Sequence, residues 1–77
     1  MQDRATALLK DELGDFGADS FEACLDGSTL QVTVAGSRRR LRRLAGSARA
    51  RDATARLLRE LGEDLGFTEA HLFTELR

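Results

Sequence analysis

Tryptophan, tyrosine and proline are absent from the sequence, and cysteine and histidine occur once each, as Cys24 and His71. One cysteine excludes an intramolecular disulfide, and one histidine without a nucleophile or a second ligand beside it carries no signature of catalysis. No apolar run approaches the ~20 residues of a membrane span, and the charged amino terminus is unlike a signal peptide. We therefore expect a non-enzymatic cytoplasmic protein with no metal, no cofactor and no membrane partner.

The length of 77 residues predicts one small domain that spans residues 1–77. A chain below ~80 residues buries a modest core, and its stability is marginal without further support. A homodimer or a protein partner would supply that support. Abundant alanine, arginine, leucine, aspartate and glycine are typical of a GC-rich bacterial genome, and the hydrophobic fraction of 42% is too high for a disordered tail.

Charge is sorted along the chain, although the whole is near neutral. From Ser37 to Arg59 lie nine of the twelve basic residues with Asp52 as the only acid, which gives this stretch a balance of +8. The remaining residues hold three basic and twelve acidic side chains, a balance of −9. The nine basic residues are Arg38, Arg39, Arg40, Arg42, Arg43, Arg49, Arg51, Arg56 and Arg59.

Two interpretations of this arginine-rich stretch are favoured over membrane-surface binding, because the opposite helix face has Leu and Ala without the bulky Phe or Trp of an interfacial helix. Guanidinium groups pair with phosphates through charge and bidentate hydrogen bonds, so clustered arginines indicate a nucleic-acid-binding surface. Alternatively, the arginines pair with the acid-rich first helix and tail, within one chain or between subunits, because the two charge balances nearly cancel. The first interpretation predicts RNA or another single-stranded nucleic acid as the partner, and the second predicts a homodimer or an acidic protein partner.

Hydrophobic periodicity predicts a helix over residues 4–13, followed by a turn over 14–19. Apolar residues then alternate with polar ones over 21–25 and again over 30–34. The Asp-Gly sequence at residues 26–27 separates these two runs, and alternation on both sides of such a turn is a strong hairpin signal.

The stretch 38–61 is predicted as two helices that meet at Gly46 and Ser47, with one continuous helix as the alternative. A lone glycine costs only ~1 kcal/mol inside a helix, but Ser47 is a good N-cap for a second helix. Residues 68–76 alternate as in a strand and would also suit a short helix. We favour the strand, because a two-stranded hairpin is barely stable alone. Phe73 would then face outward, towards a dimer interface or a stacked base.

The predicted fold class is α+β, with a small three-stranded sheet, helices on one face and the element order α-β-β-α-α-β. With Gly46-Ser47-Ala48-Arg49 between the two later helices, this order resembles the type II KH fold, in which a GxxG loop joins two helices and a strand follows. The chain resembles small bacterial single-KH proteins over most of its length. The pattern from Gly27 to Leu44 is also similar to the KH-like domain of DciA-type helicase loaders.

The resemblance implies an RNA-binding module, but Arg49 stands where the family has the second glycine of its loop. That loop lets the KH backbone approach four nucleotides closely. Gly46 could still serve, whereas Arg49 would add charge and obstruct the approach, and KH-like domains without GxxG also occur as protein-interaction scaffolds. The predicted interface combines phosphate-binding arginines with backbone amides at a helix N-terminus. Its residues are Arg38, Arg39, Arg42, Arg43, Gly46, Ser47 and Arg49.

Overall fold

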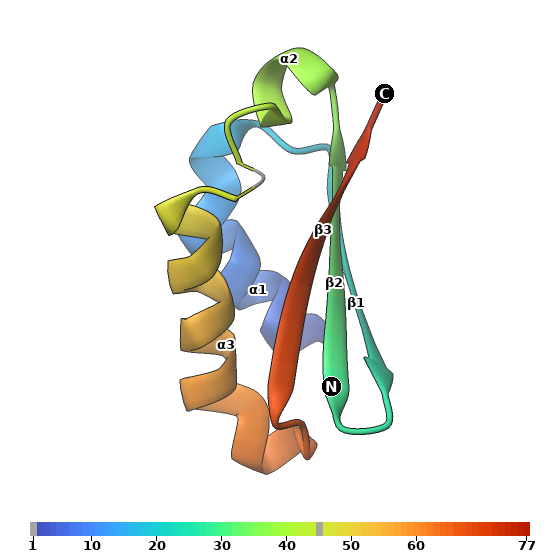
Figure 1. Cartoon of the computed structure of the whole chain (residues 1–77), viewed down its shortest axis with the longest axis vertical. Coiled ribbons are helices and arrows are strands. Elements are labelled where there is room, and N and C mark those ends of the chain that lie inside the picture. Colours follow the sequence, from blue (N-terminus) through green and yellow to red (C-terminus); the bar gives the residue numbers. More distant parts are fainter. Residues whose placement is uncertain (1, 45) are drawn as a thin grey trace.

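The computed structural model describes residues 2–44 and 46–77, with side chains from residue 4 onward. Its elements follow the predicted order α-β-β-α-α-β and form an α+β fold (Figure 1). They are α1 (Gln2–Leu13), a 3₁₀ turn η1 (Gly14–Phe16), β1 (Ser20–Asp26), β2 (Thr29–Gly36), α2 (Arg38–Leu41), α3 (Ala48–Leu65) and β3 (Glu69–Leu76).

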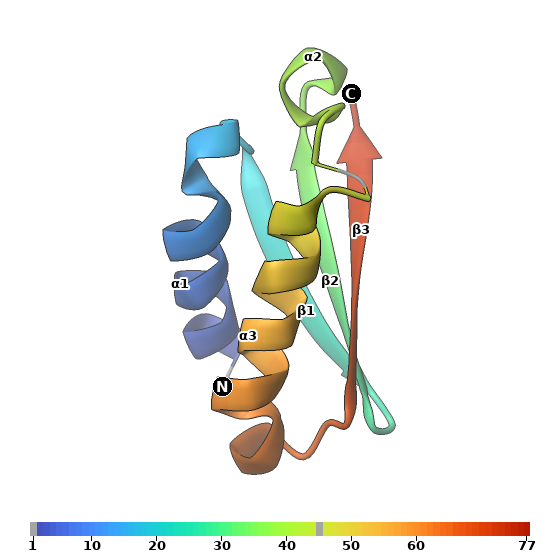
Figure 2. The ribbon, with the colours of Figure 1, turned by 60° about the vertical axis from the view of Figure 1, so that its left-hand side comes forward.

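The sheet has the strand order β1-β2-β3, so that β2 is central. β1 and β2 form an antiparallel hairpin, whereas β3 returns through α2 and α3 to pair with β2 in parallel. The hairpin turns at Gly27, whose φ of 61° lies in the left-handed region that glycine adopts without strain. Figures 1 and 2 show α1 and α3 on one face of the sheet.

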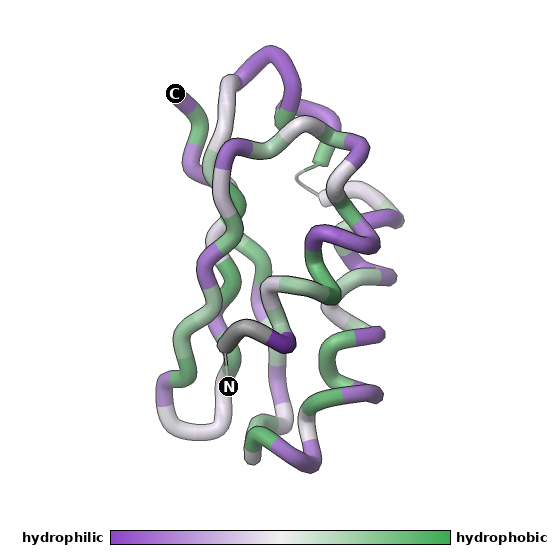
Figure 3. The backbone as a smooth tube through the Cα atoms, turned by 180° about the vertical axis from the view of Figure 1, so that it is seen from behind, coloured by the Kyte–Doolittle hydropathy of each residue, from purple (hydrophilic) through white to green (hydrophobic). Residues whose placement is uncertain are grey.

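The core lies between the sheet and the two long helices. Strand alternation directs Leu30, Val32 and Val34 towards the helices, and each is at most 3% exposed. The apolar stripes of α1 and α3 meet them with fully buried leucines, among them Leu9 and Leu57. Figure 3 shows the same sorting along the backbone, with hydrophilic positions of α3 alternating with hydrophobic ones.

The structure confirms the predicted strand in the tail and the predicted break between two helices. The first of these helices is only one turn long. Ser37 caps its start by accepting a hydrogen bond from the Arg40 amide at 3.2 Å, and the chain leaves the helix at Arg42. In α3 the corresponding cap is Ser47, whose hydroxyl accepts from the Ala50 amide at 3.1 Å. Each serine therefore starts its own helix, which one continuous helix would not allow.

Backbone hydrogen bonds hold α2 at the end of the sheet where β2 and β3 finish. The Arg77 amide donates to the Gly36 carbonyl at 2.9 Å, and the Arg38 amide donates to the Arg77 carbonyl at 3.3 Å. The first part of the arginine-rich stretch, residues 38–43, thus lies at one end of the molecule, beside the carboxyl terminus (Figures 1 and 2). Within the described part of the chain, no helix is long and apolar enough to cross a membrane.

Candidate nucleic-acid interface

The segment 38–44 exposes its arginines because its two leucines point inward. Leu41 and Leu44, three residues apart, are both fully buried. This anchoring leaves every arginine of the segment at the surface, and Figure 3 shows a hydrophilic stretch at this end of the molecule. We call these five residues the basic end: Arg38, Arg39, Arg40, Arg42 and Arg43.

The arginines of the basic end carry uncompensated charge. Across residues 4–44 and 46–77, the ion pairs of the fold involve other cations, and none includes an arginine of the basic end. Asp19 lines a shallow depression with Ser37, Arg39 and Arg40, and its carboxylate lies 3.9 Å from Arg77 instead. The basic end is therefore an exposed concentration of positive charge with little local neutralisation.

The turn at Gly46 and Ser47 follows the basic end and begins α3. Gly46 has a φ of 70°, and a Cβ built there would meet no atom within 4 Å. The glycine is thus required for its backbone conformation, and its surroundings are open to solvent. The first amides of an 18-residue helix lie next to this turn, and first-turn amides lack partners within their own helix. These amides and the helix dipole favour a negatively charged group.

A shallow groove of about 220 Å³ extends from the Gly46 turn between α3 and β3. Arg51 and Thr54 line its α3 side, and the Thr54 hydroxyl donates to the Arg51 carbonyl at 2.9 Å. Arg51 is not among the interface residues that the sequence predicted. The polar spacing of Ser47, Arg51 and Thr54, at i, i+4 and i+7, could have indicated this strip along α3. The groove is lined by Gly46, Ala50, Arg51, Thr54, Ala70, His71 and Leu72.

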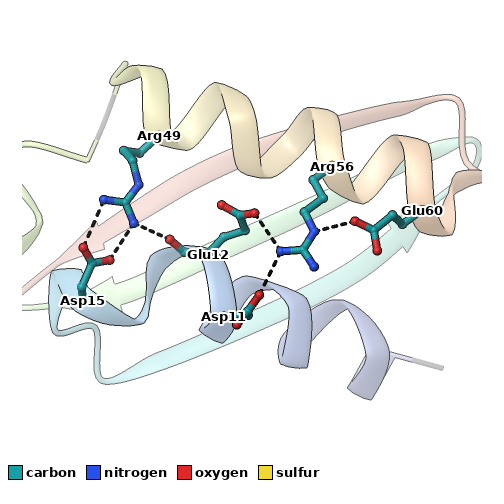
Figure 4. A network of polar contacts seen from close by, with 6 residues as sticks. All are labelled: Asp11, Glu12, Asp15, Arg49, Arg56 and Glu60. Atoms are coloured by element: carbon teal, nitrogen blue, oxygen red, sulfur yellow. Dashed lines mark hydrogen bonds and ion pairs between the residues drawn. The ribbon is translucent and has the colours of Figure 1, made fainter.

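Arg49 faces α1, and its contacts keep it away from the basic end. Its guanidinium donates to both carboxylate oxygens of Asp15, at 2.8 and 3.1 Å, and to the Glu12 carbonyl at 2.6 Å (Figure 4). It also lies over the Phe16 ring, 5.2 Å from the centroid. The hydrogen bond from Arg49 lowers the pKa of Asp15, and the same bond raises the pKa of Arg49. The predicted site residues are therefore only partly brought together.

Arg56 is also neutralised by acids of the fold. It pairs with Glu60 one turn later on α3, with Asp11 at 3.0 Å and with Glu12 at 2.7 Å (Figure 4). Hydrogen bonds to Glu60, Asp11 and Glu12, in that order, raise its pKa. The alternative interpretation of the arginine-rich stretch, internal charge pairing, thus describes Arg49 and Arg56.

The cysteine and the histidine lie on the sheet face away from the helices. Cys24 is exposed, and the His71 Nε2 lies 3.6 Å from a Glu69 carboxylate oxygen. In the part of the chain that the structure describes, no cluster of three His, Cys, Asp or Glu side chains could hold a metal ion.

No family model, curated protein or solved structure matches this chain.

Proposed function

We propose that this protein is a non-enzymatic module that binds single-stranded nucleic acid, with RNA preferred to DNA. The observation that carries the proposal is the basic end, where five adjacent arginines are exposed without an ion pair to any described residue. Arginine without an internal partner is free to exchange its counterions for phosphates, which is the main source of affinity for a nucleic-acid backbone.

The arrangement suggests a path for the strand. Phosphates would contact Arg38, Arg39, Arg42 and Arg43, and a further phosphate would lie at the open turn formed by Gly46 and Ser47. The groove beyond this turn offers apolar walls at Ala50 and Leu72 and a cation at Arg51, which suits a base followed by its phosphate. The preference for RNA rests on the resemblance to KH domains.

Arg49 is left out of the proposed phosphate contacts, because Asp15 already neutralises it. Arg49 instead holds the start of α3 against α1 through its hydrogen bond to the Glu12 carbonyl. Arg51 takes its place as the cation that lines the groove together with Gly46.

Fluorescence anisotropy with labelled single-stranded RNA and DNA, at low and moderate salt, tests the proposal. The variant is Arg42→Ala, Arg43→Ala. The matched control is Arg59→Ala, since Arg59 is exposed, has no ion pair among the described residues and lies ~18 Å from Ser47 along α3. We expect the double variant to lose about tenfold or more in affinity at low salt and the control to bind as the unmodified protein does.

The salt dependence gives a second, independent readout. A single-stranded contact contributes a slope of ~0.7 to log affinity against log salt, so loss of two contacts should flatten the slope by ~1.4. Unchanged affinity and slope in the double variant would overturn the assignment of the basic end, and absence of binding by the unmodified protein at low salt would overturn the function.

One observation favours a second candidate function, binding of an acidic protein surface. The sheet face away from the helices carries Glu22, Asp26, Glu69 and Glu75, and the three strands contain no lysine or arginine. The basic end of one copy would fit this acidic face of another. This candidate predicts self-association that is lost at high salt and in the Arg42→Ala, Arg43→Ala variant, without any response to nucleic acid.

A further inference from the structure

β3 is an uncovered edge of the sheet. Among the described residues it pairs with β2 on one side, and Figure 2 draws no described strand beyond it. The strand runs for eight residues, Glu69–Leu76, without proline or lysine. Those are devices with which proteins commonly protect such edges, and a long edge without them is a template for pairing with another chain.

The parallel pairing with β2 determines which backbone groups of β3 are free. The Arg77 amide and carbonyl both bond to the β2–α2 segment, and the Glu69 amide donates to Ser28. Residues of a strand alternate between its two sides, so every odd-numbered residue of β3 directs its backbone groups towards β2. The N–H and C=O groups of the even-numbered residues therefore point to the open edge: Ala70, Leu72, Thr74 and Leu76.

We propose that a second copy of this chain pairs antiparallel with β3, about a two-fold axis at Phe73. The two sheets then join into one continuous six-stranded sheet with the helices of both copies on the same face. In this register Ala70 lies opposite Leu76 of the second copy, and Leu72 lies opposite Thr74 of the second copy. All of these have free backbone groups, so the ladder is complete.

The outward side chains of β3 are self-complementary in this register. Reversing the strand about Phe73 brings Glu69 opposite Arg77 and His71 opposite Glu75 of the second copy. Each contact occurs twice because of the two-fold axis. These residues form the non-hydrogen-bonded pairs of the new ladder, in which facing side chains come closest, so the Glu69–Arg77 ion pairs act at the shortest cross-strand distance. The contact of Arg77 with Asp19 in its own chain is long, at 3.9 Å, and exposed to solvent, so the guanidinium can turn to Glu69 of the second copy.

Neighbouring registers lack this complementarity. A slip by two residues in one direction places Glu69 opposite Glu75, and a slip in the other direction places His71 opposite Arg77. A slip by one residue sets free backbone groups against residues that already bond to β2. The charge pattern therefore selects the register centred on Phe73.

The same pairing covers the exposed apolar side chains of the strand. Phe73 is 53% exposed and Leu76 is 38% exposed. At the axis, Phe73 meets its own copy, and Leu76 lies against Ala70 of the second copy. An otherwise unexplained exposed aromatic residue on an edge strand thus gains a partner. This inference uses none of the arginines of the basic end, although Ala70 and Leu72 also line the groove beside the Gly46 turn.

Sedimentation equilibrium of the full chain at increasing concentration, with charge-swapped variants, tests the pairing. Glu69→Arg or Arg77→Glu alone places like charges opposite each other at two symmetric positions, and we expect each to weaken the dimer by about tenfold. The double swap, Glu69→Arg with Arg77→Glu, restores opposite charges and should recover most of the affinity. Glu22→Arg, on the same sheet face but on β1, is the matched control and should leave the dimer unchanged.

Thr74→Pro adds a variant that acts on the backbone. The Thr74 amide points to the open edge, so proline there spares the pairing with β2 but removes a donor of the new ladder. We expect this variant to be a folded monomer by circular dichroism and sedimentation. A monomeric unmodified chain at millimolar concentration would overturn the proposal. A dimer that persists in Thr74→Pro would also overturn it. So would a dimer that stays weakened in the double swap Glu69→Arg with Arg77→Glu, or one that dissociates in the Arg42→Ala, Arg43→Ala variant.

Discussion

Arg49 and Arg42 have the same side chain and lie seven positions apart, but the fold gives them opposite surroundings. Arg49 meets the Asp15 carboxylate and the Phe16 ring, whereas Arg42 is exposed and has no ion pair with any described residue. A guanidinium that is already hydrogen-bonded to a carboxylate has little to gain from a phosphate. At the scale of single residues, function therefore depends on which arginines the acids of α1 leave unoccupied.

Asp15→Asn should make the stability of the protein less sensitive to acid. Arg49 holds the pKa of Asp15 below its ordinary value of 3.8. A lowered pKa in the folded state means that the stabilisation is complete above pH 3.8 and is lost as the pH falls through the lower folded value. We expect Asp15→Asn to have a lower urea midpoint at neutral pH, and the difference from the unmodified protein to vanish in strong acid. Equal midpoints at neutral pH would contradict this, and Glu22→Gln, an exposed carboxylate on β1, serves as the control.

Gly46→Ala should destabilise the protein by ~1 kcal/mol, because an L side chain is strained at positive φ. Gly14→Ala is the matched control. A Cβ at either position meets no atom within 4 Å, but only Gly46, at φ 70°, has a positive φ. We expect Gly14→Ala to change the free energy of unfolding little, as measured by urea denaturation. Equal effects of the two substitutions would show that the Gly46 backbone is not confined to the left-handed region.

At the scale of elements, the break between α2 and α3 positions the candidate site. A continuous helix would distribute its arginines around its whole circumference. The break instead places the basic end beside the end of the sheet and leaves the Gly46 backbone accessible to solvent. The sequence predicted this break through Gly46 and Ser47, and the Ser47 hydroxyl caps α3 as expected. It did not predict that α2 would be a single turn, since the apolar spacing of Leu41 and Leu44 also suits a longer helix.

Ser47→Ala should cost ~1 kcal/mol of stability, because the substitution removes the acceptor for the Ala50 amide at the start of an 18-residue helix. Ser37→Ala removes the equivalent bond to Arg40 from a helix of four residues and should cost less. Thermal or urea denaturation of both variants provides the measurement. A larger loss in Ser37→Ala would mean that α2 contributes more to the fold than its length indicates.

At the scale of the whole molecule, the residues that stabilise the fold are different from the arginines of the basic end. The core lies between the sheet and the long helices, and α2 joins it mainly through one fully buried leucine, Leu41. The charges that stabilise the fold connect α1 and η1 to α3, through Arg56 and Arg49 respectively (Figure 4). The charges of the basic end take no part in those contacts.

Arg42→Ala, Arg43→Ala should therefore leave the free energy of unfolding within ~0.5 kcal/mol of the unmodified protein, as is usual for exposed residues without partners. Urea denaturation at low salt provides the measurement. Loss of nucleic-acid affinity at unchanged stability would separate a binding defect from a folding defect. A marked loss of stability would show that these arginines support the fold and would remove the double variant as a test of binding.

Local patterns in the sequence were sufficient for the class and order of the elements. Alternation around Asp26 and Gly27 predicted the hairpin, and Gly46 with Ser47 predicted the start of the second helix, because these signals depend on residues a few positions apart. From the sequence alone, residues 68–76 suited either a strand or a short helix. Their pairing with β2 along the whole register from Glu69 to Leu76 makes them a strand.

The division of the arginines into paired and free groups required the tertiary structure. Arg49 and Asp15 are 34 positions apart, and Arg56 and Asp11 are 45 positions apart. The charge balances along the chain were compatible with pairing of all the arginines or of none. Ion pairing depends on distances of a few ångströms, and only the packing of α1 against α3 brings those acids within reach of Arg49 and Arg56 while leaving the basic end exposed.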